Sequence, residues 1–408
     1  MSHNFTNKFI LNALDLPIIS NLEDLSDSIG ISTQMIYLLS KKNERFYKEF
    51  TIEKRNGSSR NISSPTLPMK LVQKWILVNI LEKIKVSSQS MAFIKGVSGC
   101  KVNAEYHHNN LYLLKLDLEN FFDNIKQKRV YSLFRNLGYN GEIAGILSNI
   151  CTLKDSLPQG GVTSPYISNL ICTKLDRRLE KLCSLRDVTY TRYADDLAFS
   201  CDNIDTLKKL KNIIEDIIKD EDFLINIQKT KISSKNVRMR INGITLNADK
   251  LKVDKALKRK IRAQIHHMFL KADFSDFEKI KGYISYISSI EPDYKNKIII
   301  YIKKLTTKLG YHEDIVNAFN KSGFAYLISN SMQFKGIKDF DNFCRYLDFD
   351  EEGHPIIYEI EESDFFKQNS EIEKRDDFLK KNNFKSSTNY PNLNETKQIV
   401  DNEDMYPF

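Results

Sequence analysis

The sequence lacks the features that mark several classes of protein. No apolar run in its 408 residues approaches the roughly 20 residues that cross a bilayer, and its start lacks the basic-then-apolar plan of a secretory signal. Its six cysteines are scattered without CxxC spacing, so neither a zinc site nor a disulfide framework is expected. These absences predict a protein of the reducing cytoplasm that does not enter a membrane.

The charge is unevenly distributed along the chain. Residues 1–320 carry 50 Lys and Arg against 35 Asp and Glu, whereas residues 321–408 carry 11 against 18. With 41% hydrophobic and 28% charged residues, the composition is that of a soluble globular protein, and 408 residues are enough for two or three domains. A basic body favours a polyanionic partner, although a generally lysine-rich protein would show the same balance.

The stretch TRYADDLAFS, residues 191–200, places two aspartates inside a run of strand-forming residues. Because strands avoid aspartate, Asp195 and Asp196 are expected at the tip of a hairpin. Two interpretations are open at this point: a solvated turn, or two carboxylates held for metal binding. A third carboxylate, Asp117, lies near the end of LYLLKLDL, residues 111–118, which is apolar on both faces and predicts a buried strand.

Three carboxylates gathered at one edge of a sheet could hold two divalent ions roughly 3.5–4 Å apart for phosphoryl transfer. Carboxylate oxygens suit Mg²⁺, which keeps substrate phosphates in its coordination shell. Between the aspartates, LPQGGVTSP, residues 157–165, predicts a loop whose paired glycines let the backbone approach a ligand closely. Such a loop alone is weak support, and two unrelated acidic positions remain the competing interpretation.

Apolar periodicity and turn residues predict the elements around these motifs. Ser32 is a candidate cap for a helix that begins after it, and Asn56-Gly57 predicts a hairpin turn. Further elements are expected as helices at 68–85, 126–137, 142–152, 166–184 and 204–219, a hairpin at 188–201, and helices only from 253 to 311.

Four motifs occur in a fixed order: DLENFFDN, which begins at Asp117, then LPQGGVTSP, YADD, and INIQKT, which contains Lys229. This ordered set resembles motifs A to D of reverse transcriptases. The resemblance is strongest to the bacterial retron-type enzymes, whose fingers hairpin is similar to FTIEKRNGSSRNISSP, residues 50–65. A related reverse transcriptase of antiphage defence would carry the same motifs.

The resemblance implies an α+β fold, a right-hand polymerase with fingers, a palm of antiparallel sheet backed by helices, and a small helical thumb. The expected divisions are 1–110 for the N-terminal helices and fingers, 111–250 for the palm, 251–320 for the thumb, and 321–408 for an acidic extension. The polar composition of that extension predicts partial disorder.

The resemblance also implies the catalytic residues. Asp117, Asp195 and Asp196 would ligate two Mg²⁺ ions, with the Leu118 carbonyl helping one of them, and Mn²⁺ is an alternative ion. A primer hydroxyl would attack the α-phosphate of the incoming nucleotide. Lys229 matches the lysine that could protonate the leaving pyrophosphate.

Four further residues are expected to contact the nucleotide. Lys54 and Arg60 lie on the fingers hairpin, and the guanidinium of Arg60 is favoured because it contacts phosphate bidentately. Gln159 is expected near the nucleotide and template. Phe122, five residues after Asp117, is expected to lie under the sugar and exclude a 2′-OH; a core position for this ring is the alternative.

VNAEYHHNN contains Asn103-Ala104-x-x-His107, which is similar to a signature that precedes motif A in retron enzymes and implies RNA binding by Asn103 and His107. Capping and packing of a helix would explain the same residues. The chain departs from the family pattern at RINGITLN, where Asn242-Gly243 stands in place of the Val-Thr-Gly associated with recognising the retron's own RNA. Specificity for a cognate RNA is therefore open.

The implied function is an RNA-directed DNA polymerase that makes DNA from dNTPs on a noncoding RNA template in bacterial antiphage defence. Two alternatives remain: a defence-associated reverse transcriptase outside true retrons, with a different template or primer, and a non-catalytic RNA-binding scaffold. The expected partners are the template RNA, the DNA product and dNTPs, with an effector protein, a second polymerase or a second copy of the chain as further options.

Overall fold

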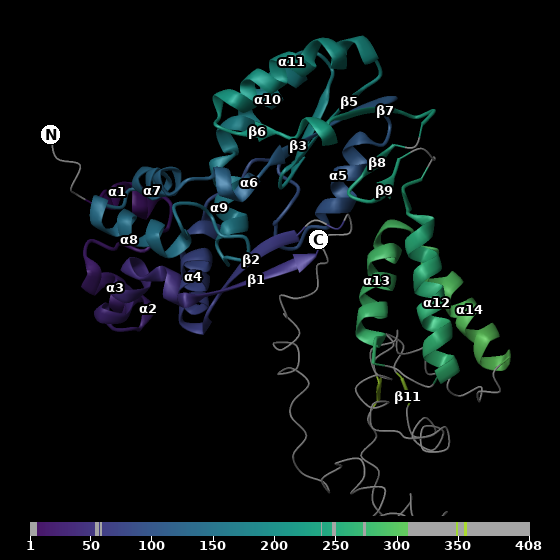
Figure 1. Cartoon of the computed structure of the whole chain (residues 1–408), viewed down its shortest axis with the longest axis horizontal. Helices are drawn as coiled ribbons and strands as arrows, with labels where there is room; N and C mark the ends of the chain where they lie inside the picture. Colours follow the sequence, from purple (N-terminus) through teal and green to yellow (C-terminus); the bar gives the residue numbers. More distant parts are fainter. Residues whose placement is uncertain are drawn as a thin grey trace, which may run out of the picture. The chain divides into compact units, whose positions relative to one another are not determined.

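The computed structural model describes residues 6–53, 57, 59–237, 239–246, 250–271, 275–308, 348–349 and 355–356. The chain divides into two compact units, residues 1–251 and 252–408 (Figure 1). Lys54 and nearly all of the predicted acidic extension lie outside the described residues. Within the described part, none of the helices has the length and apolar character needed to span a membrane.

A five-stranded antiparallel sheet forms the centre of the first unit. β3 (Tyr112–Glu119) pairs with β5 (Asp196–Cys201), β6 (Leu224–Ile225) and β7 (Lys231–Ser234), and β5 pairs in turn with β4 (Thr189–Tyr193). The leucines of β3 are all buried, which confirms the buried strand predicted from its apolar sequence. The predicted hairpin is also confirmed, so all three aspartates stand on this sheet or its turn.

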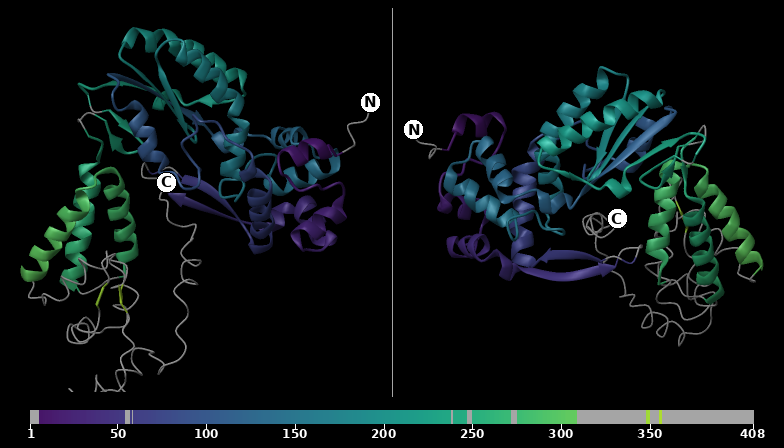
Figure 2. Two further views of the ribbon diagram at one scale, coloured as in Figure 1. Left: turned by 180° about the vertical axis from the view of Figure 1, so that it is seen from behind. Right: turned by 45° about the horizontal axis from the view of Figure 1, so that its top comes forward.

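Two helices cover β4 and β5: α10 (Thr173–Ser184) and α11 (Ile204–Asp220) (Figure 2). The Asn203 side chain caps α11 by accepting from the backbone N–H groups of its first turn. The buried residues of α11 recur at helical spacing, which is the pattern that predicted this helix: Leu207, Leu210, Ile214 and Ile218.

The single helix predicted over 166–184 is wrong in one respect. It is two helices, α9 (Ser164–Ile171) and α10, which meet at Cys172, where ψ is −4°. Buried leucines at 170, 175 and 179 continue across this break. Periodicity alone therefore could not reveal the interruption.

The remaining helices of the first unit, except α5 (Gly99–His107), share one continuous core with the sheet. Ser32 caps α3 as predicted, accepting from the Met35 N–H at 3.3 Å. The helix predicted over 68–85 ends earlier, at Asn79, and a 3₁₀ turn follows at Leu81–Lys83. The bounds are α1 (Lys8–Ala13), α2 (Leu22–Ile29), α3 (Thr33–Lys41), α4 (Leu67–Asn79), α5 (Gly99–His107), α6 (Phe121–Asn124), α7 (Gln127–Asn136) and α8 (Gly141–Cys151).

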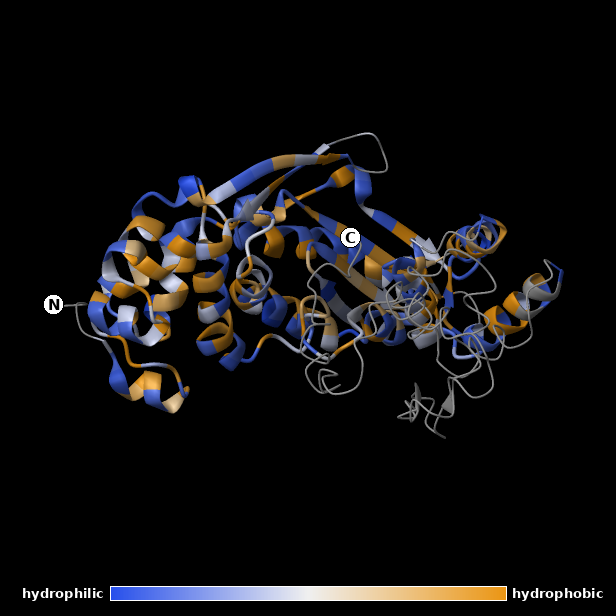
Figure 3. Cartoon of the chain, turned by 90° about the horizontal axis from the view of Figure 1, so that it is seen from below, coloured by the Kyte–Doolittle hydropathy of each residue, from blue (hydrophilic) through white to orange (hydrophobic). Residues whose placement is uncertain are grey.

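The predicted fingers hairpin is confirmed as β1 (Tyr47–Glu53) paired with β2 (Ser59–Pro65). Gly57, in its turn, has a φ of +79°, a left-handed conformation that glycine adopts without strain. Most residues of this hairpin are polar (Figure 3), and the apolar Phe50 and Ile52 of β1 are each 50% exposed. A second, short hairpin joins β8 (Arg240–Ile241) to β9 (Ile244–Thr245).

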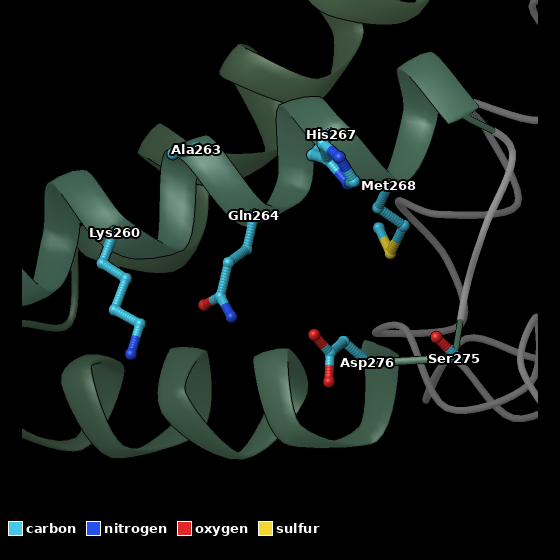
Figure 4. A pocket seen from close by; sticks show the side chains of 7 residues that line it. All are labelled: Lys260, Ala263, Gln264, His267, Met268, Ser275 and Asp276. Atoms are coloured by element: carbon cyan, nitrogen blue, oxygen red, sulfur yellow. The ribbon is translucent and has the colours of Figure 1, made fainter.

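The second unit contains the three predicted basic helices, α12 (Lys255–Lys271), α13 (Phe277–Ile290) and α14 (Tyr294–Lys308), preceded by β10 (Lys252–Val253). Their apolar faces pack together, and Lys258 of α12 donates to Glu291 at 2.6 Å. A pocket of about 330 Å³ opens between α12 and α13, with polar side chains that include Lys260 and Gln264 (Figure 4). A two-residue pair, β11 (Asp348–Phe349) with β12 (Pro355–Ile356), completes the described elements.

Candidate active site

The pairing of β3 with β5 brings the three aspartates together. Asp117 lies opposite Asp196 in the register, and the Leu118 N–H donates to the Asp195 carbonyl at 2.9 Å. Ala194 and Asp195 form the two-residue turn between β4 and β5. Asp117 is only 8% exposed, and Asp195 and Asp196 are half-buried. The doublet is therefore at a turn, but the turn is not fully solvated.

Burial and mutual repulsion disfavour the charged forms of the doublet. Burial, and then the charges of Asp196 and Asp117, raise the pKa of Asp195 from 3.8 to about 6. Burial also raises the pKa of Asp196, although Lys115 acts in the opposite direction. Carboxyl groups with raised pKa values that face other carboxylates are typical of functional sites.

Lys229 supplies positive charge to this cluster. Its Nζ lies 3.0 and 2.9 Å from the two carboxylate oxygens of Asp117, and this contact raises the pKa of Lys229. The neighbouring Asn226 N–H donates to the Asp117 carbonyl at 2.8 Å, which holds this segment against β3. Because the Lys229 side chain is 61% exposed, its ammonium group is free to move away from Asp117 without unfolding the site.

The donor set fits a hard divalent cation. Carboxylates from adjacent strands offer the oxygen ligands that such ions prefer, and a cationic group already lies on Asp117. In the part of the chain that the structure describes, no three acidic, histidine or cysteine side chains converge closely enough to form a ready metal-binding group. Binding of a cation would thus require Lys229 to withdraw and the carboxylates to close.

The raised pKa of Asp195 predicts how the effect of a bound divalent cation on stability would depend on pH. Between pH 3.8 and about 6 the folded protein binds more protons at Asp195 than the unfolded chain does, so the contribution of Asp195 to stability without cations falls as the pH rises through this range. A divalent cation bound by the three carboxylates would offset the repulsion between them that remains above pH 6. We therefore expect Mg²⁺ to raise Tm more at pH 7.5 than at pH 5, measured by thermal unfolding; an equal effect at both would contradict this.

The side chains of Phe122 and Arg60 are both partly exposed. Phe122 stands on the short helix α6, half-buried, with its ring edge-on to Phe121 at 5.3 Å. Its ring packs against the core on one side, and its contact with the sugar stays a prediction. Arg60 lies on β2 opposite Ile52 and is half-buried.

The glycine-rich loop, residues 157–165, is hydrogen-bonded to β2 of the fingers hairpin. The Ser63 N–H donates to the Gln159 carbonyl at 2.8 Å. Gly160, with a φ of +117°, could not carry a side chain, since its Cβ would lie 2.8 Å from the Ser63 carbonyl oxygen. Buried Gln73, which sequence reasoning missed, accepts from the Val162 N–H at 3.1 Å and donates to Tyr47. The loop is thereby held from two sides.

Asn103 and His107 are buried on α5 and contact the palm strands. Their exposed fractions are 1% and 0%. The Thr191 hydroxyl donates to Asn103, so the imidazole donates Nε2–H to Thr191 at 2.7 Å and accepts from Ser200 at Nδ1. Asn103 also donates to Asn242 at 2.6 Å. RNA binding by this pair stays a prediction, and direct contact would require these hydrogen bonds to open.

Burial lowers the pKa of His107 to about 3, which predicts a loss of stability in mild acid. Below pH 6.5 His107 binds a proton in the unfolded chain but not in the folded protein, so the contribution of His107 to the free energy of unfolding falls by about 1.4 kcal/mol per pH unit down to pH 3. We expect His107→Gln to flatten this dependence in denaturant titrations, and His108→Gln to leave it in place. Equal slopes for both variants would contradict this role.

A family model described as "Reverse transcriptase (RNA-dependent DNA polymerase)" matches residues 52–280. The chain belongs to the reverse transcriptase family. It is 36% identical to the Retron Ec86 reverse transcriptase of Escherichia coli, over 76% of this chain and 97% of that protein. It is 29% identical to the Retron Mx65 reverse transcriptase of Myxococcus xanthus, over 69% of this chain and 71% of that protein.

Among solved structures, apo telomerase from Candida tropicalis is 15% identical, with a TM-score of 0.47, over 73% of this chain and 62% of that chain. Family membership rests on the sequence matches, and the matched residues 52–280 contain the four ordered motifs that begin with DLENFFDN. The reverse transcriptase is thus an RNA-directed DNA polymerase, and its described part combines helices with antiparallel sheets. Enzymes of this family use divalent metal ions.

Proposed function

We propose that this reverse transcriptase copies a noncoding RNA into DNA at a site formed by Asp117, Asp195 and Asp196. The observation that supports this best is the register of β3 and β5, which sets Asp117 opposite Asp196 beside the turn that carries Asp195. Together with the Leu118 carbonyl, these carboxylates would hold two Mg²⁺ ions, and Mn²⁺ could replace them. Bound ions would lower the charge barrier between the primer hydroxyl and the α-phosphate.

Other residues would bind and orient the nucleotide. Once released from Asp117, Lys229 is within reach of the same site and is the proposed proton donor to pyrophosphate. Arg60 of β2, and Lys54 by the family pattern, would neutralise the triphosphate. Gln159 would contact the nucleotide and template from the fastened loop, and the exposed part of the Phe122 ring would lie under the sugar.

The biological setting proposed is a retron in a bacterial cytoplasm. Its partners would be a structured template RNA, the DNA product and dNTPs, and antiphage defence would add an effector protein. The second candidate is a defence-associated reverse transcriptase outside true retrons, with a different template or primer. One observation favours this second candidate. Asn242 stands where retron enzymes carry the Val-Thr-Gly triplet, and its side-chain oxygen accepts a hydrogen bond from Asn103 of the same chain.

Sequencing the nucleic acid that co-purifies with the protein from its native locus tests this proposal. A discrete DNA joined to a structured RNA, present with wild type and lost in Asp195→Asn/Asp196→Asn, is the expected result. DNA of repetitive or unrelated sequence would favour the second candidate. RNA bound equally by both proteins, with DNA in neither, would contradict the polymerase and leave an RNA-binding scaffold.

A further inference from the structure

A fully buried ion pair lies directly behind the turn that carries Asp195. Arg192 of β4 and Asp176 of α10 are both 0% exposed. The guanidinium donates from Nε and Nη2 to the two carboxylate oxygens of Asp176, each at 2.8 Å. Tyr190 donates to the same carboxylate at 2.9 Å. Such a pair costs desolvation energy and contributes little net stability, so its presence calls for another explanation.

The third nitrogen of the guanidinium contacts the turn formed by Ala194 and Asp195. Nη1 of Arg192 donates to the Ala194 carbonyl at 3.3 Å. Ala194 has a φ of +54°, whereas its turn partner Asp195 is not among the described residues with positive φ. Positive φ at the first position alone is the pattern of a type II′ turn, where glycine is preferred. An alanine there is strained and needs an external contact to hold it.

The guanidinium is also fixed from the opposite side. Nη1 donates to the Asn169 side-chain oxygen at 3.1 Å, and Asn169 in turn donates to the Ala92 carbonyl at 2.9 Å. The backbone of Arg192 is paired as well, because its N–H donates to Gln89 and its carbonyl accepts from Met91. Arg192 thus has a single position, defined by α9, α10 and residues 89–92.

We propose that Arg192 and Asp176 are positioning residues that set the geometry of the catalytic turn. The carboxylate fixes the guanidinium, the guanidinium holds the Ala194 carbonyl, and Ala194 directs Asp195 and Asp196 toward Asp117. The Leu118 N–H completes the arrangement by holding the Asp195 carbonyl at 2.9 Å from the other side. This inference rests on the proposed role of the three aspartates in catalysis.

The test separates positioning from folding. In Arg192→Met/Asp176→Asn both charges are removed together, so no unpaired charge is buried, and the asparagine still accepts from Tyr190. We expect a folded protein whose kcat for dNTP addition falls by on the order of tenfold to a hundredfold, with little change in KM for dNTP. We also expect a severalfold higher Mg²⁺ concentration at half-maximal rate. Arg192→Lys keeps the positive charge but cannot make the two parallel hydrogen bonds to Asp176. Its kcat and its Mg²⁺ requirement should lie between those of the double variant and wild type.

Arg178→Met is the matched control, because it breaks the ion pairs of α10 with Asp220 at 2.8 Å and Glu221 at 2.7 Å, and neither of these is one of the contacts described above that hold the turn. It should leave kcat and the Mg²⁺ dependence as in wild type. A folded double variant with wild-type kcat and Mg²⁺ dependence would overturn the inference. If the double variant does not fold, Arg192→Lys decides by the same two measurements, and wild-type values for it would overturn the inference.

A different result would show that the three aspartates are not the catalytic site. In that case Asp195→Asn/Asp196→Asn would keep its activity in the same assay, whatever the Arg192 variants do. Activity lost in the aspartate variant but retained in the folded Arg192 variants would leave the proposed function standing and contradict only the positioning role.

Discussion

Replacing both Asp195 and Asp196 by asparagine should lower the rate of DNA synthesis by on the order of 1,000-fold or more. The two carboxylates are the charges that would hold the cations against the α-phosphate, and asparagine offers only neutral oxygens in their place. The same change removes the repulsion and the burial cost that raise the pKa of Asp195. We therefore expect the variant to be at least as thermally stable as wild type at pH 7.5 without Mg²⁺.

The measurements are primer extension on an RNA template and thermal unfolding of the same preparations. Asp187→Asn is the matched control: it removes one negative charge at an exposed position just before β4 and should leave synthesis unchanged. An aspartate variant that is inactive because it has lost stability would contradict the electrostatic explanation. A variant that still synthesises DNA would contradict the catalytic role of the doublet.

Replacing Phe122 by valine should relax the choice between deoxy- and ribonucleotides. The ring is half-buried, so its exposed part is available to exclude a 2′-OH from the space under the sugar. Removing it should raise kcat/KM for rNTPs relative to dNTPs by on the order of 100-fold, the range that steric discrimination in a pocket provides. Steady-state incorporation of single nucleotides measures this ratio.

Phe121→Leu is the control for the neighbouring ring. Phe121 is 4% exposed and stacks on Phe223 at 5.7 Å, so this change should lower stability and leave sugar discrimination as in wild type. If both variants lose stability and neither changes discrimination, Phe122 is a core residue and the sugar contact lies elsewhere.

Local patterns in the sequence predicted the strand and the turn on which the three aspartates lie, and they also predicted one helix cap. The apolar run of β3, the aspartate doublet between strand-forming residues and the cap of Ser32 all depend on neighbours within a few positions, and the structure confirms them. The break at Cys172 was missed because apolar spacing continues through it.

Contacts between distant residues could not be read from the sequence. Arg192 binds Asp176 across 16 positions, and Gln73 holds the glycine-rich loop across 89. Neither Arg192 nor Gln73 is a residue of the four ordered motifs. The one sequence signal for the Arg192–Asp176 pair is that Arg192 is a charged residue within the strand-forming run before Asp195. Asn103 and His107 did stand in a motif, but only the fold shows that they are buried and fully hydrogen-bonded.

The most direct test of the metal site replaces Mg²⁺ with Fe²⁺ and maps where hydroxyl radicals from the bound iron cut the polypeptide. Cuts near Asp117 and near Asp195-Asp196 in the wild-type protein, absent from Asp195→Asn/Asp196→Asn, are the result we expect. Cuts at other segments alone, or the same cuts in both proteins, would contradict a catalytic metal site formed by β3 and the β4–β5 turn.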